Sequence, residues 1–436
     1  MDQTVSRQIN LSEFWKAYAS VLISFITSRL LIQTDMVMVA PLGSAATAAF
    51  AVPGKLMVID AIFAFALGPV ISVAVSREKE EAKKNKSIVS ALGFTLALST
   101  LLTVLGLLCY PTMIDYLIGD KEVGRLAHAN VFWMTLSIPV RLLTFISTMC
   151  LFASGRGRQV SYVYAITLTA NAVLDWFLIY KLNYGFAGAY ISTFLVSSIE
   201  LVWLIYITYS LVKQFPFGQF DFGWVKSIGG KISAEWLRLM SWQAEGLVVL
   251  ALLASRSDWS QPFSAFGVTS EFTTLLLMPL LALMRTSAMQ LAAANPDNHL
   301  GVARQLIRPV RNVAFISTVL VGLTIAVMST AIGKYIYHLD GLRLEWWRAF
   351  SVTYGICFPV YAYSYVQRSC YQACNMFSEV TRIEMLVTWL LFIPTLYFSL
   401  VRSAPALFFF GYIGKEMLIA MWLRFRSLNS YNTVPA

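Results

Sequence analysis

Long apolar stretches separated by short polar segments run along the whole chain. Twelve of them have the roughly 20 residues that a helix needs to cross about 30 Å of hydrocarbon. We therefore predict an all-α polytopic membrane protein with twelve transmembrane helices. The predicted spans lie near residues 14–39, 48–76, 88–108, 128–152, 161–180, 185–212, 234–255, 262–291, 311–332, 348–372, 383–401 and 404–423.

The composition agrees with this pattern. Hydrophobic residues make up 58% of the chain and charged residues 13%, whereas soluble domains have about 45–50% and 25%. No signal peptide is expected, because the first residues up to Leu11 are polar and carry a single basic side chain, Arg7. The five cysteines show no zinc-binding or disulfide spacing.

The net charge of +10 is distributed as membrane topology requires. With a cytoplasmic amino terminus, 19 Lys and Arg residues fall on the cytoplasmic side, eight on the opposite side and six within spans. This asymmetry follows the positive-inside rule. We therefore expect both termini in the cytoplasm and no nucleic-acid partner, with a bacterial inner membrane as the default location.

Two weak internal matches predict a repeat of two halves. Ala49-Phe-Ala-Val resembles Ala265-Phe-Gly-Val, and Cys150-Leu-Phe-Ala resembles Cys370-Tyr-Gln-Ala. An even number of spans per half gives a parallel repeat about an axis along the membrane normal. We predict an amino-terminal six-helix lobe over residues 1–213, a cytoplasmic linker over 214–232 and a carboxy-terminal six-helix lobe over 233–436.

The most informative polar residues are Asn171 and Asp175 in the fifth span. They are four residues apart and share one helical face. A carboxylate at a helix centre costs about 2.5–3.5 kcal/mol to insert into a membrane. An amide beside a carboxylate can coordinate a proton or a small cation, so the pair favours an ion-coupled transporter; the alternative is a structural Asp bonded to neighbouring helices.

Two stretches carry a resemblance to a known family. They are Thr34-Asp-Met-Val-Met-Val-Ala-Pro-Leu-Gly43, and Asn171-Ala-Val-Leu-Asp-Trp176 followed by Tyr184-Gly-Phe-Ala-Gly-Ala-Tyr-Ile-Ser-Thr193. With these motifs the whole chain resembles the multidrug and toxic compound extrusion (MATE) family of transporters. Ala40 stands where the family usually has Gly.

The resemblance implies a cation site in the amino-terminal half, made of Asp35, Asn171, Asp175 and Thr193. Two carboxylates that share a site cannot both ionise cheaply, so such a pair can hold a proton or Na⁺. No cofactor and no other metal is expected. The resemblance also implies an acidic residue early in the seventh span, for which Glu245 is the candidate, although Ser241 occupies the place of the usual Pro.

Further charged residues within spans are candidates for substrate contacts or a gate: Lys55, Asp60, Arg141 and Glu271. Each has an alternative role in a structural ion pair or in snorkelling to the interface. Lys55 and Glu271 occupy equivalent repeat positions, so we predict that they pair across the extracellular mouth. Lys55 and Arg141 would suit an anionic or zwitterionic cargo.

We therefore expect a monomeric transporter that exports amphipathic small molecules by alternating access, coupled to proton or sodium antiport. The cargo is either drugs or a dedicated metabolite such as a siderophore-like or peptide product. The alternatives are a lipid-linked precursor flippase of the same superfamily, a major-facilitator-type transporter, and a non-transporting receptor. An enzyme is not expected, since the sequence has no nucleophile elbow, metalloprotease motif or P-loop.

Overall fold

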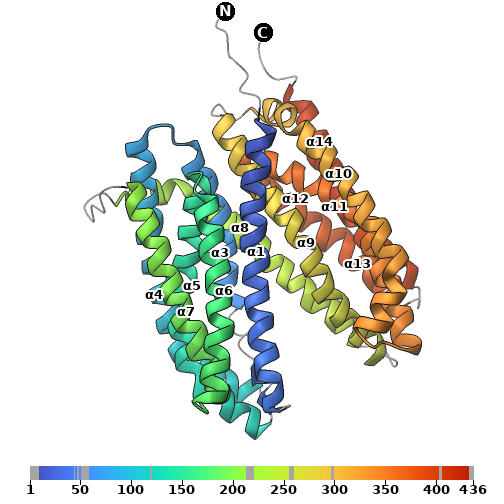
Figure 1. Ribbon diagram of the computed structural model, residues 1–436. Coiled ribbons are helices and arrows are strands. Elements are labelled where there is room, and N and C mark those ends of the chain that lie inside the picture. Colours follow the sequence, from blue (N-terminus) through green and yellow to red (C-terminus); the bar gives the residue numbers. More distant parts are fainter. Residues whose placement is uncertain are drawn as a thin grey trace, which may run out of the picture. The chain divides into compact units, whose positions relative to one another are not determined.

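The computed structural model describes residues 9–43, 45–46, 49–50, 58–117, 120–212, 220–254, 260–295, 299–401 and 405–431. All regular elements in these ranges are helical (Figure 1). Nine helical stretches among the described residues are long and apolar enough to cross a membrane. Many of their large apolar side chains face outward: Leu108 is 69% exposed and Val327 is 82% exposed. Such a surface suits lipid rather than water, so the protein is a multi-pass integral membrane protein.

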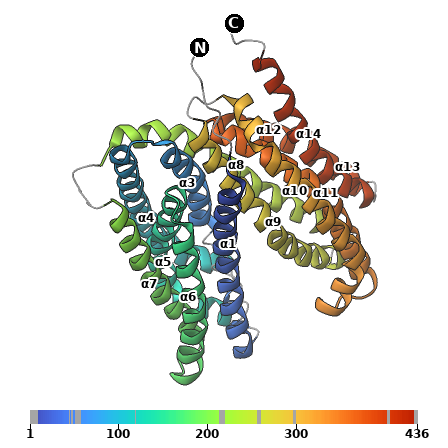
Figure 2. The ribbon, with the colours of Figure 1, turned by 45° about the horizontal axis from the view of Figure 1, so that its top comes forward.

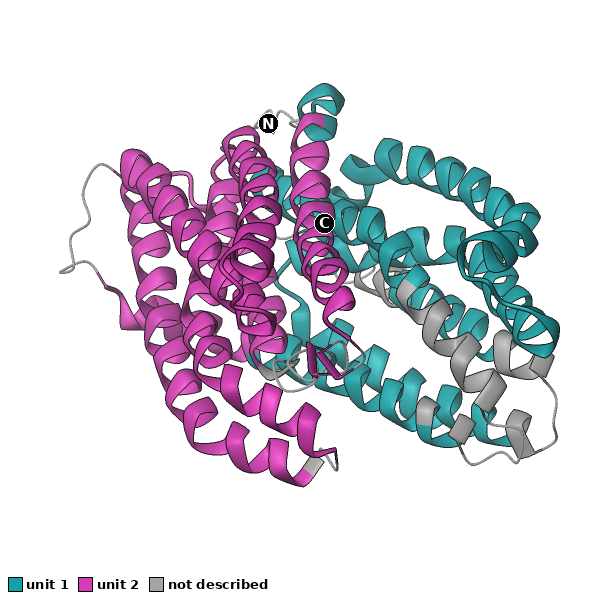
Figure 3. Ribbon diagram, turned by 60° about the horizontal axis from the view of Figure 1, so that its bottom comes forward, with its two compact units in different colours: residues 1–15, 233–436 teal, residues 16–232 magenta. Residues whose placement is uncertain are grey.

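One compact unit comprises residues 16–232 (Figure 3). Its central helix is α5, which contacts α3, α4, α6 and α7. Met134, Ile138 and Leu142 on α5 form a buried apolar cluster with Tyr110 on α4, and this cluster fixes the helices that carry the polar residues described below. The helices are α1 (Leu11–Val39), α3 (Val58–Arg77), α4 (Glu81–Leu117), α5 (Lys121–Ala153), α6 (Gly157–Trp176) and α7 (Phe186–Val212).

The other unit comprises residues 233–436 together with the chain up to Trp15. Its central helix is α11, which contacts α9, α10, α12 and α14. Trp347 on α11 is fully buried and donates a hydrogen bond of 2.7 Å to the Ser329 carbonyl. The helices are α8 (Phe222–Ala254), α9 (Ser260–Ala294), α10 (Leu300–Ala331), α11 (Gly341–Ala373), α12 (Phe377–Val387), α13 (Ile393–Val401) and α14 (Pro405–Tyr431).

The two central helices end in the same way. Each is followed by a residue of positive φ, Gly155 at 75° and Asn375 at 61°. The next amide, of Arg156 or Met376, donates to a carbonyl five residues earlier at 2.9 Å in both cases. This is the bonding of a Schellman helix end. The two turns are 220 residues apart, which is the spacing of the second sequence match and supports an internal repeat.

Several helices begin earlier than the predicted spans, and short irregular turns follow or interrupt others. Helix α8 starts at Phe222, inside the stretch 214–232 that we predicted as a linker. Three π-helical turns and one 3₁₀ turn follow or interrupt long helices. They are η1 (Ala40–Leu42), η2 (Phe177–Lys181), η4 (Ile332–Ile336) and η5 (Thr388–Phe392).

Candidate functional site

Two buried carboxylates meet where α1 and α6 approach each other. Asp35 lies in the last turns of α1, and Asn171 and Asp175 lie one turn apart on α6. The side-chain amide of Asn171 donates to Asp35 Oδ1 at 2.6 Å and to Asp175 Oδ2 at 2.9 Å. Asp35 is 4% exposed, whereas Asn171 and Asp175 are fully buried. One amide therefore joins the two acidic groups.

Helix α7 supplies the remaining polar groups through two consecutive residues. Thr193 Oγ1 donates to Asp35 Oδ2 at 2.9 Å, and Ser192 Oγ donates to Asp175 Oδ1. The structure thus brings together all four residues predicted for the cation site and adds Ser192. No sequence pattern indicated Ser192, although it lies next to Thr193.

Both hydroxyls have a second acceptor. Ser192 Oγ lies 2.9 Å and Thr193 Oγ1 2.8 Å from the Ala189 carbonyl oxygen. A hydroxyl carries a single hydrogen, so each one donates either to a carboxylate or to its own helix. The site therefore contains two polar groups that can change partner without a change of rotamer.

Local backbone features hold α1, α6 and α7 close together. The π-helical turn η2 directly follows Asp175 and Trp176, and Tyr180 in this turn donates to the Met38 carbonyl at 2.6 Å. Gly188 on α7 packs against the same turn, where a Cβ atom would lie 3.0 Å from the Ile179 amide nitrogen. Such π turns often occur at functional sites.

The geometry suits a proton or a small monovalent cation. All four carboxylate oxygens of Asp35 and Asp175 accept a hydrogen bond from a neutral donor. No positively charged side chain is bonded to either of them in the described ranges, so a bound cation or a proton is needed to offset two negative charges in a buried site.

A second polar group in the same unit contains two more of the predicted residues. Arg141 on α5 forms an ion pair of 2.6 Å with Asp60 on α3. Tyr190 on α7 interacts electrostatically with both Asp35 and Arg141, and none of the described residues forms a hydrogen bond with its buried hydroxyl. This tyrosine therefore lies between the cation site and the ion pair.

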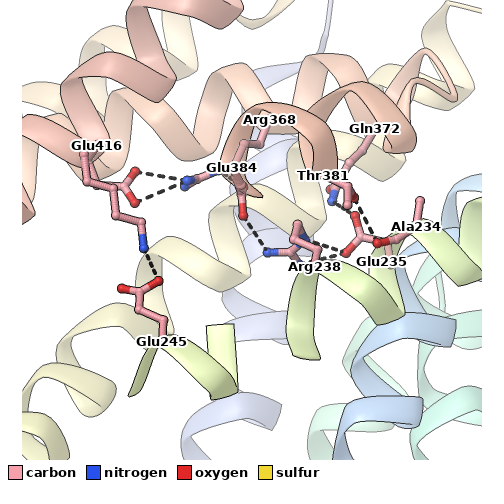
Figure 4. Close-up of polar contacts among 10 residues, drawn as sticks. Ala234, Glu235, Arg238, Glu245, Arg368, Gln372, Thr381, Glu384 and Glu416 are labelled. Carbon is pink, nitrogen blue, oxygen red and sulfur yellow. Dashed lines mark hydrogen bonds and ion pairs between the residues drawn. The ribbon is translucent and has the colours of Figure 1, made fainter. Parts of the chain in front are cut away.

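The carboxy-terminal unit contains a buried network of ion pairs (Figure 4). Glu384 on α12 contacts Arg368 Nε at 2.5 Å and Arg238 Nη1 at 3.4 Å. At one end Arg368 reaches Glu416 at 3.1 Å, and at the other end Arg238 reaches Glu235 at 2.7 Å. These contacts join α8, α11, α12 and α14.

Glu245, predicted as a substrate or gate residue, lies at the edge of this network. It is 6% exposed and forms an ion pair with Lys415 on α14. Ser241, one turn earlier on α8, accepts a hydrogen bond of 2.8 Å from the Trp389 indole. Glu245 thus has a half-buried cationic partner.

The predicted gate lies outside what the structure describes. Lys55 falls in the undescribed residues 51–57, and the side chain of Glu271 is not described. Among the described residues, no group of three or more His, Cys, Asp or Glu side chains is placed to hold a metal ion. The sodium alternative would therefore depend on the amide and hydroxyl oxygens around Asp35 and Asp175.

Comparisons with known proteins agree with the predicted resemblance. The MatE family model matches residues 21–177, a range that includes Asp35, Asn171 and Asp175. No curated protein matches this chain in sequence.

Solved structures match nearly the whole chain. A MATE transporter in the bent conformation has a TM-score of 0.87 and 15% identity over 97% of this chain and 96% of its own. The Vibrio cholerae MATE transporter VcmN in the bent form has a TM-score of 0.86 and 16% identity over 97% of both chains. A MOP superfamily transporter from Pyrococcus furiosus has a TM-score of 0.85 and 15% identity over 95% of both chains. The predicted twelve-helix fold and the resemblance to the MATE family are confirmed.

Proposed function

We propose that this chain, which has the MATE fold, is a secondary transporter that exports amphipathic small molecules in exchange for a cation bound between Asp35 and Asp175. The observation that carries the proposal is the buried carboxyl pair bonded only to neutral donors in the described ranges. Uncompensated charge is expensive in a membrane interior. A site built in this way therefore exchanges a cation rather than serving only to stabilise the fold.

A proton is the coupling ion that this geometry favours. The Asn171 amide bridges Asp35 and Asp175, and a proton on one carboxyl group removes the repulsion between two neighbouring negative charges. A sodium ion would instead need oxygen lone pairs directed at one point. In the described arrangement the carboxylate oxygens already accept hydrogen bonds from Asn171, Ser192 and Thr193.

The Ala189 carbonyl, as a second acceptor for both hydroxyls, offers a physical means of coupling proton binding to a change in helix packing. When both carboxylates are ionised, Ser192 and Thr193 donate to them and hold α7 against α1 and α6. When a proton binds, the carboxyl pair needs fewer donors, and the hydroxyls return to the Ala189 carbonyl. Proton binding would thereby loosen the contact of α7 with α1. Bent and straight conformations are both known for a matched MATE transporter, and alternating access of this chain would use the same kind of change.

The charges near the site bear on the cargo. Arg141 is bonded to Asp60, so the pair offers a neutral dipole rather than an isolated positive charge. This favours an amphipathic or zwitterionic cargo, either a range of drugs or one metabolite such as a siderophore-like or peptide product. For the Pyrococcus furiosus transporter, the reverse polarity of its binding pocket has suggested a different function.

We further propose that the protein works as a monomer in a bacterial inner membrane, with both termini in the cytoplasm. The excess of basic residues on one side of the predicted spans supports this orientation. The resulting direction of transport is outward, driven by a proton that enters.

Gradient-driven flux tests the proposal. Purified protein would be reconstituted into vesicles with ethidium and, separately, carboxyfluorescein as cargo probes, with pH and Na⁺ gradients imposed one at a time. The wild type should move at least one probe under the pH gradient, and Asp175→Asn should not. Asp115→Asn is the matched control, because its carboxylate is 73% exposed. Undiminished pH-driven flux in Asp175→Asn would overturn the proposal, and flux driven by Na⁺ alone would replace the proton by sodium.

A further inference from the structure

A basic pocket lies between α10, α11 and α14, and its lining includes none of the residues of the cation site or of the ion-pair network. Its volume is about 560 Å³. These three helices lie side by side within the carboxy-terminal unit (Figure 2). Arg304, Arg311 and Arg424 line the pocket, and no carboxylate does. The pocket thus concentrates positive charge beside a membrane-spanning helix.

Two of the arginines are held in place by their neighbours. Arg304 donates to the Leu423 carbonyl at 2.6 Å and lies 5.9 Å from the ring centre of Tyr371. Arg311 lies 5.9 Å from the ring centre of Tyr363. Neither contact neutralises a guanidinium charge. Arg304 Nε is buried and has no hydrogen-bond partner among the described residues, so it can still donate to an anion.

A buried hydrogen-bond acceptor in the same pocket restricts the chemistry of the ligand further. Gln367 is 2% exposed, and within the described part of the chain its Oε1 atom has no hydrogen-bond partner. A buried amide oxygen without a donor costs free energy. A ligand with an anionic group would pair with the Arg311 guanidinium, and a hydroxyl on the same ligand would donate a hydrogen bond to Gln367 Oε1.

The pocket continues into an apolar surface. Phe315 and Ile316 line it, and Ile316 begins a stripe at helical spacing on α10 that continues with Leu320, Leu323 and Val327. These four aliphatic side chains are 61%, 62%, 59% and 82% exposed. Because α10 is a candidate membrane span, this stripe has the chemistry of an acyl-chain contact.

We propose that this pocket binds one anionic phosphoglycerolipid of the cytoplasmic leaflet. Its phosphate lies among Arg304, Arg311 and Arg424, its headgroup hydroxyl donates to Gln367, and an acyl chain follows the stripe from Ile316. Arginine is well suited to phosphate, and basic pockets between transmembrane helices on the cytoplasmic side can bind anionic headgroups. The choice of leaflet rests on the orientation proposed above, but the binding chemistry does not.

Competition binding in detergent micelles tests the site without any transport measurement. A fluorescent phosphatidylglycerol would be bound to the purified protein and displaced by unlabelled phosphatidylglycerol, phosphatidic acid, phosphatidylcholine or glycerol phosphate. We expect phosphatidylglycerol to compete best, phosphatidic acid less well because it lacks the headgroup hydroxyl, and phosphatidylcholine poorly. Glycerol phosphate should need a far higher concentration, because it lacks acyl chains; equal potency of glycerol phosphate would show an anion site and overturn the lipid assignment.

Variants in one helix give the matched control. Arg311→Gln should weaken phosphatidylglycerol binding about tenfold or more, as for loss of a hydrogen bond to a charged group. Arg308→Gln removes the same charge from α10 at a position that does not line the pocket, and should have little effect. Equal losses in the two variants would show that charge near the membrane, not this pocket, binds the lipid.

A second variant covers the case in which Arg311→Gln fails to fold. Gln367→Leu should keep the affinity for phosphatidic acid and abolish the preference for phosphatidylglycerol over it. An unchanged preference in Gln367→Leu would contradict the proposed headgroup contact.

Discussion

Replacing Arg368 with methionine should destabilise the carboxy-terminal unit strongly. Arg368 is 4% exposed and contacts Glu384 at 2.5 Å and Glu416 at 3.1 Å. Methionine keeps much of the side-chain volume but leaves both carboxylates without this partner. Glu384 retains Arg238 at 3.4 Å, whereas the described contacts of Glu416 in the network are those with Arg368.

The magnitude follows from the burial of these charges. Removing one partner of a buried ion pair costs about 3–5 kcal/mol, so we expect a loss of about 4 kcal/mol in the free energy of unfolding for Arg368→Met. Adding Glu416→Gln neutralises the stranded carboxylate. The double variant should therefore be more stable than the sum of the two single effects, by about 1–2 kcal/mol.

Unfolding by sodium dodecyl sulfate in mixed micelles, followed by tryptophan fluorescence, measures these differences. Arg343→Met is a control in the same helix, because Arg343 and its partner Asp340 are 42% and 80% exposed. An exposed pair contributes about 0–1 kcal/mol. The reasoning is refuted if the Arg368 and Glu416 effects simply add, or if Arg368→Met costs no more than the control.

Two further substitutions test the packing and the cation site. Gly322→Ala should lower the free energy of unfolding by about 1–3 kcal/mol, because its Cβ atom would lie 2.2 Å from the Gly355 carbonyl oxygen. Gly246→Ala is the control, since a Cβ atom there meets nothing within 4 Å. Equal unfolding midpoints of the two variants in detergent would contradict the close approach of α10 and α11. Ser192→Ala should slow pH-driven flux several-fold while leaving folding intact, since one neutral hydrogen bond contributes about 0.5–1.5 kcal/mol; flux at the wild-type rate would remove Ser192 from the coupling step.

The sequence predicted the cation site better than the ion-pair network, for a physical reason. Asn171 and Asp175 are anomalous on an apolar helix, and helical spacing alone places them on one face. The contact of Asp175 with Ser192 depends on how closely α7 approaches, where Gly188 packs against the π turn η2, and the contact of Asn171 with Asp35 depends on the position of α1. Serine is common in membrane helices, so nothing in the sequence pattern distinguished Ser192.

The network in the carboxy-terminal unit could not be assembled from spacing. Six basic residues fall within the predicted spans, but the sequence does not show that Arg368 pairs with Glu384 and Glu416. Pairs such as Arg238 and Glu384, 146 residues apart, become neighbours only through packing of α8 against α12. Which charged residues pair across helices can be seen only in the tertiary structure. The number of helices and their apolar faces, in contrast, can be predicted from the local pattern of apolar and polar residues.

The central claim is that Asp35 and Asp175 together hold an exchangeable proton. Infrared difference spectroscopy of the purified protein during a pH titration detects the carbonyl stretch of a protonated carboxyl group directly and needs no knowledge of the cargo. We predict a band that disappears as the pH rises, is lost in both Asp35→Asn and Asp175→Asn, and persists in Asp115→Asn. A spectrum that is unchanged in Asp175→Asn would contradict the account.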